Sequence, residues 1–269
     1  MPPVGGLMRG RPLLPELLAR RELVENLVLR NLKQRYKGSA LGFLWSLLHP
    51  LFLVLIYLVF IRLMRFPVRL PHLLVGVMAW QFLGLCIGDA AGVVIGHASL
   101  VKKTWFPRCI LPLAAVLGNL AHFGLSLLVL AFALPALGAP PRASWLLLPA
   151  VIALQFVFCL GLSLGLSALN VFYRDVEHLV PIGLMSWFFV TPVIYSPEQV
   201  LGNPGLPPWV APLFLANPMA ALVAGYRHAL LGEPLPPLAL WPALVGALAV
   251  LAVGAFLFAR LEPAFSDEL

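Results

Sequence analysis

The chain is divided by long stretches that contain no charged residue. Cutting it at every Asp, Glu, Lys and Arg leaves seven such runs of 19 residues or more, at 38–61, 70–88, 109–141, 143–173, 178–197, 199–226 and 234–259. A transmembrane helix needs about 20 apolar residues. The pattern predicts an all-α integral membrane protein with six transmembrane helices, at about 41–64, 73–97, 111–134, 145–170, 179–196 and 238–260.

The run 199–226 does not predict a simple transmembrane helix. It contains Pro204, Pro207, Pro208, Pro212 and Pro218, and prolines at this density remove the backbone hydrogen bonds that a lipid-exposed helix requires. We expect 199–226 to form two short helices that lie on the surface or re-enter the membrane, in the last extracytoplasmic loop.

Composition and charge narrow the class of protein. Of 269 residues, 61% are hydrophobic and 11% charged, which excludes a cytosolic enzyme and a disordered chain. The same composition excludes a disulfide-stapled secreted domain. Cys86, Cys109 and Cys159 show no paired spacing and are interpreted as small packing residues. Thirteen of the 18 basic residues fall on the side of the two termini; the other side keeps Arg62, Arg65, Arg69, Arg142 and Arg227. The positive-inside rule therefore places both termini in the cytoplasm, and no nucleic-acid partner is expected from the net charge of +7.

The chain before the first predicted span has a helical pattern of its own. Val24, Val28 and Leu32 recur every four residues, which predicts an amphipathic helix at the membrane surface within a cytoplasmic segment 1–40. A solvated cytoplasmic helix is the alternative. The transmembrane domain is predicted at 41–260 and a cytoplasmic tail at 261–269. The residues assigned to the interfacial helix are Arg30, Lys33, Arg35, Tyr36 and Lys37.

Two short loops on the cytoplasmic side combine polar and aromatic residues. In the first, Pro107 turns the chain and is expected to present Trp105 and Phe106 at the surface, beside Lys102, Lys103 and Arg108. Such residues suit the pocket of a partner protein, although an interfacial aromatic belt is the alternative. The second loop contains Arg174 and Asp175, which suit a polar contact with a partner or act as charges that stop membrane insertion.

Two patterns within the spans concern helix packing. Glycines recur every four residues in the second span, at Gly84, Gly88, Gly92 and Gly96, beside Asp89. We expect this stripe to allow close approach of another helix. The stretch 161–165 matches the G-x-S-x-G pattern of hydrolases, but it lies in an apolar helix. We interpret Gly161 and Gly165 as a G-x-x-x-G packing motif.

Aromatic side chains gather in the first and fifth spans. They give one face of each helix a surface on which sugar rings could stack, although packing and lipid contact are the alternatives. No phosphate-binding loop, zinc-protease motif or C-x-x-C pair is present, so the chain is not expected to be an enzyme or to hold a cofactor. The aromatic residues are Trp45, Phe52, Tyr57 and Phe60 in the first span, and Trp187, Phe188 and Tyr195 in or at the end of the fifth.

In this order, the motifs resemble the permease subunits of ABC-2 type polysaccharide exporters, which handle O-antigen, capsular polysaccharide and teichoic acid. The resemblance runs from about residue 22 to the C-terminus. It is carried by residues 32–51, by 100–113, by Phe172 to Asp175, by Thr191 to Tyr195, by Asn217-Pro218, by Tyr226-Arg227 and by Arg260 to Leu269. Cys109 departs from the pattern, because an acidic residue is expected after Phe-Pro-Arg.

The resemblance implies an assembly in the bacterial cytoplasmic membrane. Two copies of the chain would form a channel for a lipid-linked polysaccharide, and two cytoplasmic ABC ATPase subunits would bind ATP and Mg²⁺. Lys102 to Arg108, with Arg174 and Asp175, would contact the ATPase. The aromatic residues of the first and fifth spans would line the channel, and Asn217, Pro218, Tyr226 and Arg227 would belong to a gate on the extracytoplasmic side.

Three other functions are compatible with parts of the pattern. An ABC-2 permease for small drugs or lipids would need no aromatic channel. An intramembrane lipid-glycan transferase would need convergent polar groups, whereas Asp89 is the only acidic residue within a predicted span. A membrane anchor for another protein would need neither the channel nor the broken outer loop.

Overall fold

The computed structural model describes residues 20–39, 41, 44–64, 69–103, 106–202, 204–236 and 238–269. Trp105 and the side chains of Arg35 and Tyr36 lie outside the described residues, and so does half of the predicted segment 1–40, namely residues 1–19 and 40. The helices are α2 (Arg21–Tyr36), α3 (Trp45–Met64), α4 (Leu70–Ala91), α5 (Val93–Gly96), α6 (Ala98–Lys103), α7 (Ile110–Ala136), α8 (Leu148–Phe172), α9 (Asp175–Val190), α10 (Pro197–Leu201), α11 (Val210–Leu215), α12 (Pro218–Leu231), α13 (Trp241–Leu261) and α14 (Phe265–Glu268), with 3₁₀ turns at Ala143–Leu147 and Glu262–Ala264.

The all-α architecture agrees with the sequence pattern in the described residues, which contain no strand. Five helices, α3, α4, α7, α8 and α13, are long and apolar enough to cross a membrane. The fifth predicted span, 179–196, is replaced by the 16-residue α9, which is only about 24 Å long. It ends at Val190 because Pro192 disfavours a helical conformation at Thr191, which is extended.

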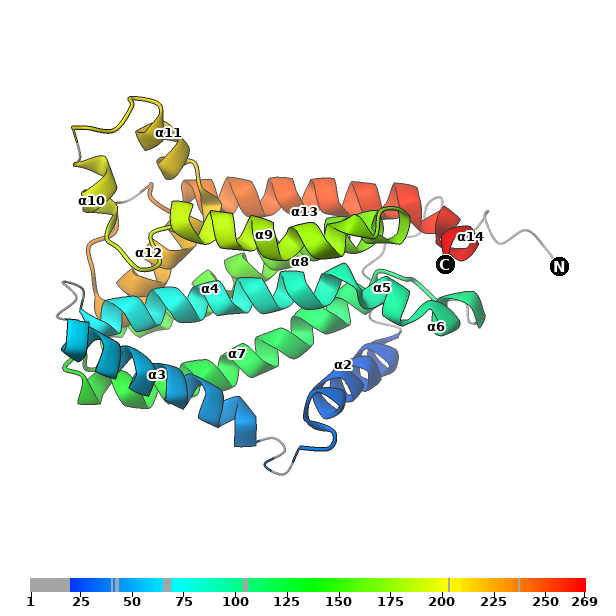
Figure 1. The fold of residues 1–269 in the computed structure, drawn as a ribbon, viewed down its shortest axis with the longest axis horizontal. Coiled ribbons are helices and arrows are strands. Elements are labelled where there is room, and N and C mark those ends of the chain that lie inside the picture. Colours follow the sequence, from blue (N-terminus) through cyan, green and yellow to red (C-terminus); the bar gives the residue numbers. More distant parts are fainter. Residues whose placement is uncertain are drawn as a thin grey trace.

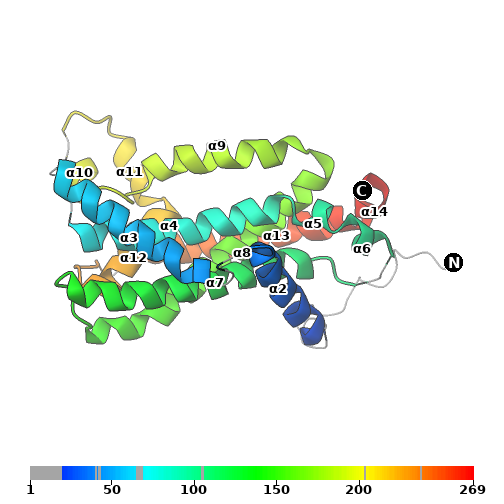
Figure 2. The same cartoon turned by 60° about the horizontal axis from the view of Figure 1, so that its bottom comes forward.

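Helix α4 lies at the centre of the bundle and α3 at its edge. Of the residues in the spanning window, 72% are buried in α4 but only 6% in α3. The largest apolar cluster joins α4 to α7, α8 and α12 through residues such as Phe82, Phe123, Phe158 and Tyr226. Helices α3 and α9 flank α4 in Figure 1, and α3 crosses in front of α4 in Figure 2. Both α3 and α9 keep a large exposed apolar face.

Helices α8 and α13 make the closest helix contact of the bundle, and glycines make it possible. A Cβ atom on Gly161 would lie 2.5 Å from the backbone nitrogen of Leu251, and one on Gly254 would overlap the carbonyl oxygen of Gly161. Gly165, one turn further, has ordinary contact distance to the Cα of Gly254, at 3.6 Å. The predicted packing role of the 161–165 motif is therefore confirmed.

The glycine stripe of the second predicted span behaves differently. That span is broken at Gly92, where α4 ends and the short α5 begins. Added Cβ atoms on Gly84, Gly88 and Gly96 would meet nothing within 4 Å among the described residues. Gly92 faces the carboxylate of Glu177 instead of a helix backbone. The close helix approach predicted for the stripe is thus not found in the described part of this chain.

Candidate coupling surface and translocation path

The two loops predicted to contact the ATPase, which we call the coupling loops, lie at the end of the molecule that also holds the C-terminal helix. Helix α6 carries Lys102 and Lys103 in its last turn, and both side chains are exposed. Helix α14 lies beside α6 at this end (Figure 1). Arg174 and Asp175 are also exposed, at the start of α9. These four charged residues are therefore accessible to a partner protein.

Phe106 and Pro107 are not exposed, so the prediction that Phe106 faces a partner is wrong for this structure. Phe106 is 4% exposed and belongs to a second apolar cluster, with Leu27, Ile110 and Phe265. The turn at Pro107 is present, but it directs Phe106 into the protein because helices α2 and α14 supply an apolar surface there. Among the described residues of this loop, Lys102, Lys103 and the exposed part of Arg108 are accessible to a partner.

Arg108 holds the C-terminal segment against the loop. Its backbone N–H donates to the Glu262 carboxylate over 2.9 Å, and its guanidinium donates to the Glu262 carbonyl and to the Ser266 hydroxyl. The guanidinium carbon also lies 5.8 Å from the centre of the Phe265 ring. An acidic residue is therefore present beside Arg108, but it is Glu262 from the C-terminal segment and not the neighbouring residue at position 109.

Replacing Arg108 by glutamine is expected to loosen residues 262–269. Three hydrogen bonds hold this segment, and two of them come from the guanidinium, each contributing about 1 to 3 kcal/mol. Hydrogen–deuterium exchange of the C-terminal peptide should accelerate by about tenfold or more. Lys103→Gln is the control and should leave the exchange unchanged, because the exposed Lys103 side chain forms no hydrogen bond or salt bridge with this segment in the described residues. Equal exchange in both variants would contradict the role of Arg108.

Helix α2 packs against protein through its apolar face. Leu27 is 4% exposed, and Leu23, Val24 and Val28 are half-buried against the cluster that contains Phe106. Arg30, Lys33 and Lys37 point away from that cluster and are exposed. The amphipathic pattern is therefore present, but its apolar side faces α7 and α5 rather than being free for lipid.

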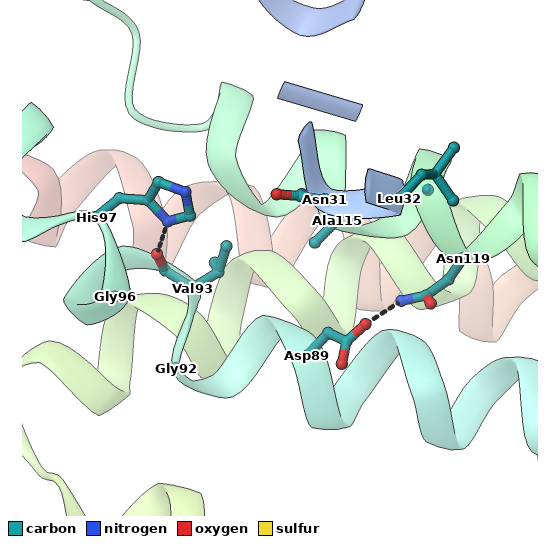
Figure 3. Close-up of a pocket in the computed structure, with 10 residues that line it drawn as sticks. Asn31, Leu32, Asp89, Gly92, Val93, Gly96, His97, Ala115 and Asn119 are labelled. Atoms are coloured by element: carbon teal, nitrogen blue, oxygen red, sulfur yellow. Dashed lines mark hydrogen bonds between the residues drawn. The ribbon is translucent and has the colours of Figure 1, made fainter. Parts of the chain in front are cut away.

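A cavity of about 440 Å³ opens between α2, α5, α7 and the end of α4 (Figure 3). Asp89 and Asn119 face each other in it, and the Asn119 amide donates to the Asp89 carboxylate over 2.9 Å and to the Leu85 carbonyl over 3.2 Å. His97 donates from Nδ1 to the Val93 carbonyl over 2.7 Å. Burial lowers the pKa of His97, and Arg30 adds to this, while the bond to Val93 opposes it. Asp89 is thus held by a partner at the edge of the bundle.

Most of the aromatic residues predicted in the first span lie on the exposed side of α3. Trp45, Phe52 and Phe60 are 42%, 47% and 43% exposed, whereas Tyr57 is half-buried against the cluster of Leu73, Val77 and Val193. Three of the four predicted side chains are therefore available to line a path or to contact lipid.

The aromatic residues of α9 mostly pack within the chain. Trp187 lies edge-on to both Trp80 and Phe158, with ring centres 6.1 and 5.9 Å apart, and Phe188 packs on Trp80 at 5.5 Å. Tyr195 follows α9, is half-buried and donates its hydroxyl to the Phe189 carbonyl over 3.0 Å. The assignment of these aromatic residues to a channel remains a prediction, because a channel would need a second protein surface opposite them.

The segment after α9 contains three helices instead of the two expected, and α12 is buried. Asn217 caps α12: its side-chain oxygen accepts from the Met219 N–H over 3.0 Å, and Pro218 occupies the first turn. The same oxygen accepts from the Trp187 indole over 3.1 Å, while the Asn217 amide donates to Thr191 over 3.1 Å. Asn217 therefore fixes the end of α9 to the start of α12.

Arg227 fixes α12 to the segment after α9 and to α4. It is 2% exposed and donates to the carbonyls of Val193, over 2.9 Å, and His72, over 3.3 and 3.4 Å. Tyr226 beside it is 1% exposed and packs edge-on to Phe123. The sequence placed both residues in an outer gate; in this chain they lie inside the bundle.

Glu233 belongs to a group of polar residues at this end of the bundle. The other members are His72, Thr191, Asn217 and Arg227. The Glu233 carboxylate lies 2.8 Å from Nδ1 of His72. Burial alone would raise the pKa of Glu233, but the hydrogen bond from His72 and the charges of His72, Arg227 and Arg69 outweigh it, so the pKa lies below its ordinary value. The described residues contain no group of three His, Cys, Asp or Glu side chains that could hold a metal ion.

Comparison with known proteins places the chain among membrane transporters. The family model for ABC-2 type transporters matches residues 22–231. The O-antigen export system permease protein RfbA of Myxococcus xanthus is 36% identical over 228 residues, which cover 83% of this chain and 86% of the relative. Two proteins of the same name from Klebsiella pneumoniae are 33% and 34% identical, over 74% of this chain and 76% of each relative. The chain therefore belongs to the ABC-2 type transporter family.

Proposed function

We propose that the chain is the permease subunit of an ATP-driven exporter that moves a lipid-linked polysaccharide of the O-antigen class across the bacterial cytoplasmic membrane. The observation that carries this proposal is the identity of 33–36% with O-antigen export permeases over about three quarters or more of both chains. The exposed aromatic residues of α3 support it, because aromatic rings can stack on sugars without selecting one hydroxyl pattern.

The channel is formed between two copies of the chain. Helices α3 and α9 carry large apolar side chains on their free faces, for example Leu55 at 53%, Ile56 at 58%, Ile182 at 64% and Met185 at 67% exposed. The two helices flank the buried α4 (Figure 1). A second copy would cover part of them and bring its own Trp45, Phe52 and Phe60 opposite those of the first.

ATP and Mg²⁺ are bound by two cytoplasmic ABC ATPase subunits. The chain has no phosphate-binding loop, and it presents exposed charges on two loops at one end, at Lys102, Lys103, Arg174 and Asp175. Both termini and these loops face the cytoplasm. Binding of ATP moves the ATPase subunits, and α6 transmits this movement to the end of α4.

Deletion of the gene tests the proposed function. Cells without it should lose O-antigen at the surface and accumulate lipid-linked glycan inside, and a plasmid-borne copy should restore export. Resistance to small drugs should not change. Normal surface polysaccharide in the deletion strain, or a changed drug sensitivity with normal polysaccharide, would contradict the proposal and favour an ABC-2 permease for small molecules.

Reversing the charge of α6 tests the coupling surface. The variant Lys102→Glu/Lys103→Glu should lower export by about tenfold or more, because two exposed cations are replaced by anions at a protein contact. The level of the permease in the membrane should stay normal, while co-purification of the ATPase falls. Lys102→Arg/Lys103→Arg keeps the charges and should export normally. Full export by the double glutamate variant would rule out contact at α6.

Removing aromatic rings tests the path. Trp45→Ala combined with Tyr195→Ala should lower polysaccharide export by about tenfold while co-purification of the ATPase stays normal, since each lost stacking contact weakens glycan binding by about 1 kcal/mol. Phe132→Ala is the control, because Phe132 is a 76% exposed aromatic residue of α7 and does not belong to either predicted aromatic helix. Unchanged export in the double variant would argue against an aromatic path.

A further inference from the structure

A second cavity lies at the end of the molecule opposite α6 and α14. It has a volume of about 600 Å³ and is enclosed by the end of α3, the start of α4, the turn after α7 and the residues after α12. Its walls combine apolar side chains, such as Leu58, Ile61 and Leu137, with the guanidinium groups of Arg62, Arg69 and Arg142. Three of the five basic residues on the predicted outer side therefore line one cavity.

The charge of this cavity is predominantly positive. Glu233 is its only acidic lining residue, and that carboxylate is engaged by His72 at 2.8 Å. Within the described ranges, no salt bridge or hydrogen bond is found for the side chains of Arg62, Arg69 or Arg142, and all three residues are exposed. The charge of Arg69 also acts on Glu233, but none of the three guanidinium groups is occupied by a salt bridge in the described residues. Exposed guanidinium groups that line one cavity are suited to an external anion.

Local backbone structure adds to this preference. Arg69 precedes the first turn of the 22-residue α4, which has no side-chain cap, so the positive end of the helix dipole points toward the cavity. Arg142 lies over Gly232, where a Cβ atom would come within 2.7 Å of its Nη1 atom and where φ is +70°. Gly232 thus leaves the space in which the Arg142 guanidinium sits beside the cavity.

We propose that this cavity binds the phosphate headgroup of a membrane lipid at the extracytoplasmic surface. The planar guanidinium matches the phosphate oxygens with two parallel hydrogen bonds. Leu58 and Ile61 continue into the exposed apolar face of α3, where Leu55, Val59 and Leu63 offer a surface for an acyl chain. A free phosphate would use the arginines but not this apolar wall. The inference rests on the proposed function in one respect: the proposed function places the termini in the cytoplasm, and the cavity therefore opens on the extracytoplasmic side.

Binding is measured with the full-length chain purified in a zwitterionic detergent and titrated calorimetrically with three probes. Dioctanoyl phosphatidic acid should bind at least about tenfold more tightly than dioctanoyl phosphatidylcholine, whose choline would face the arginines. Sodium pyrophosphate should bind more weakly than phosphatidic acid, because it lacks the acyl chains. Equal affinity for the two lipids would overturn the proposal, and pyrophosphate that binds as tightly as phosphatidic acid would overturn the assignment to a lipid.

A variant and a matched control locate the site. Arg62→Gln/Arg69→Gln/Arg142→Gln should raise the Kd for phosphatidic acid by about 100-fold, with about tenfold for Arg62→Gln or Arg142→Gln alone. Arg21→Gln/Arg174→Gln/Arg260→Gln removes three exposed charges at the other end and should change the Kd by less than about twofold. Equal losses in both triple variants would overturn the proposal. Because the assay contains neither glycan nor ATPase, its failure is distinguishable from a failure of export.

Discussion

Replacing Gly161 by valine is expected to prevent stable packing of α13 on α8. The position of the Cβ atom lies 2.5 Å from the backbone nitrogen of Leu251, and backbone cannot move aside as a flexible side chain can. Overpacking against backbone costs about 3 kcal/mol or more. The purified variant should melt at least about 10 °C lower than the parent chain in detergent, and its level in the membrane should fall. Fluorescence-detected size-exclusion chromatography after heating measures both effects.

Gly165→Ala is the matched control on the same helix. Its Cβ atom would lie 3.6 Å from the Cα of Gly254, an ordinary contact distance. Alanine also favours a helix over glycine by about 1 kcal/mol, so this variant should melt within a few degrees of the parent. A Gly161→Val chain as stable as Gly165→Ala would show that the two helices do not meet as closely as described.

Replacing Arg227 by methionine is expected to release the segment after α9 from α4. The change keeps an apolar stem but removes the donors for the carbonyls of His72 and Val193, which are buried. Each unsatisfied carbonyl costs about 1 to 3 kcal/mol, and Glu233 loses a neighbouring positive charge. The chain around Thr191 to Asn217 should become sensitive to a protease added from outside, and export should fall.

Arg227→Lys separates geometry from charge. An ammonium group retains the positive charge but lacks the planar fork that reaches two carbonyls at once, so protection should be intermediate. Arg260→Met removes an exposed arginine at the other end and should leave the protease pattern unchanged. Resistance of Arg227→Met to cleavage would mean that other contacts, such as those of Asn217, suffice to hold the segment.

Periodicity and motif spacing predicted the helical framework because lipid imposes it on every span. The predicted spans 111–134 and 145–170 lie within a few residues of α7 and α8, and the Gly161 motif was assigned correctly to packing. Two boundaries were wrong for local reasons: the second span ends at Gly92, and the fifth is shortened by Pro192. These errors concern the lengths of helices and not their existence.

The sequence could not indicate contacts between residues that are far apart in the chain. Phe106 was predicted to be exposed because Pro107 turns the chain there, but the residues that bury it include Phe265, more than 150 positions later. Arg227 was counted as an outer charge, yet its acceptors are backbone carbonyls, which carry no residue signature. A local feature is easier to recognise: Asn217 followed by Pro218 is typical of the start of a helix.

The contrast in burial between α3 and α4 has a consequence for biosynthesis. Few residues of α3 are buried against the rest of the protein. A helix of this kind must be stable in lipid through its own side chains, so it can move from the insertion machinery into the bilayer without other helices. Helix α4 contains Asp89, which accepts a hydrogen bond from Asn119 of α7, and it is the least apolar of the five long helices. The helices that pack on it, α7 and α8, must therefore be made before this carboxylate is sheltered. We therefore expect α4 to be retained near the ribosome-bound translocon until the chain has been synthesised through about residue 172.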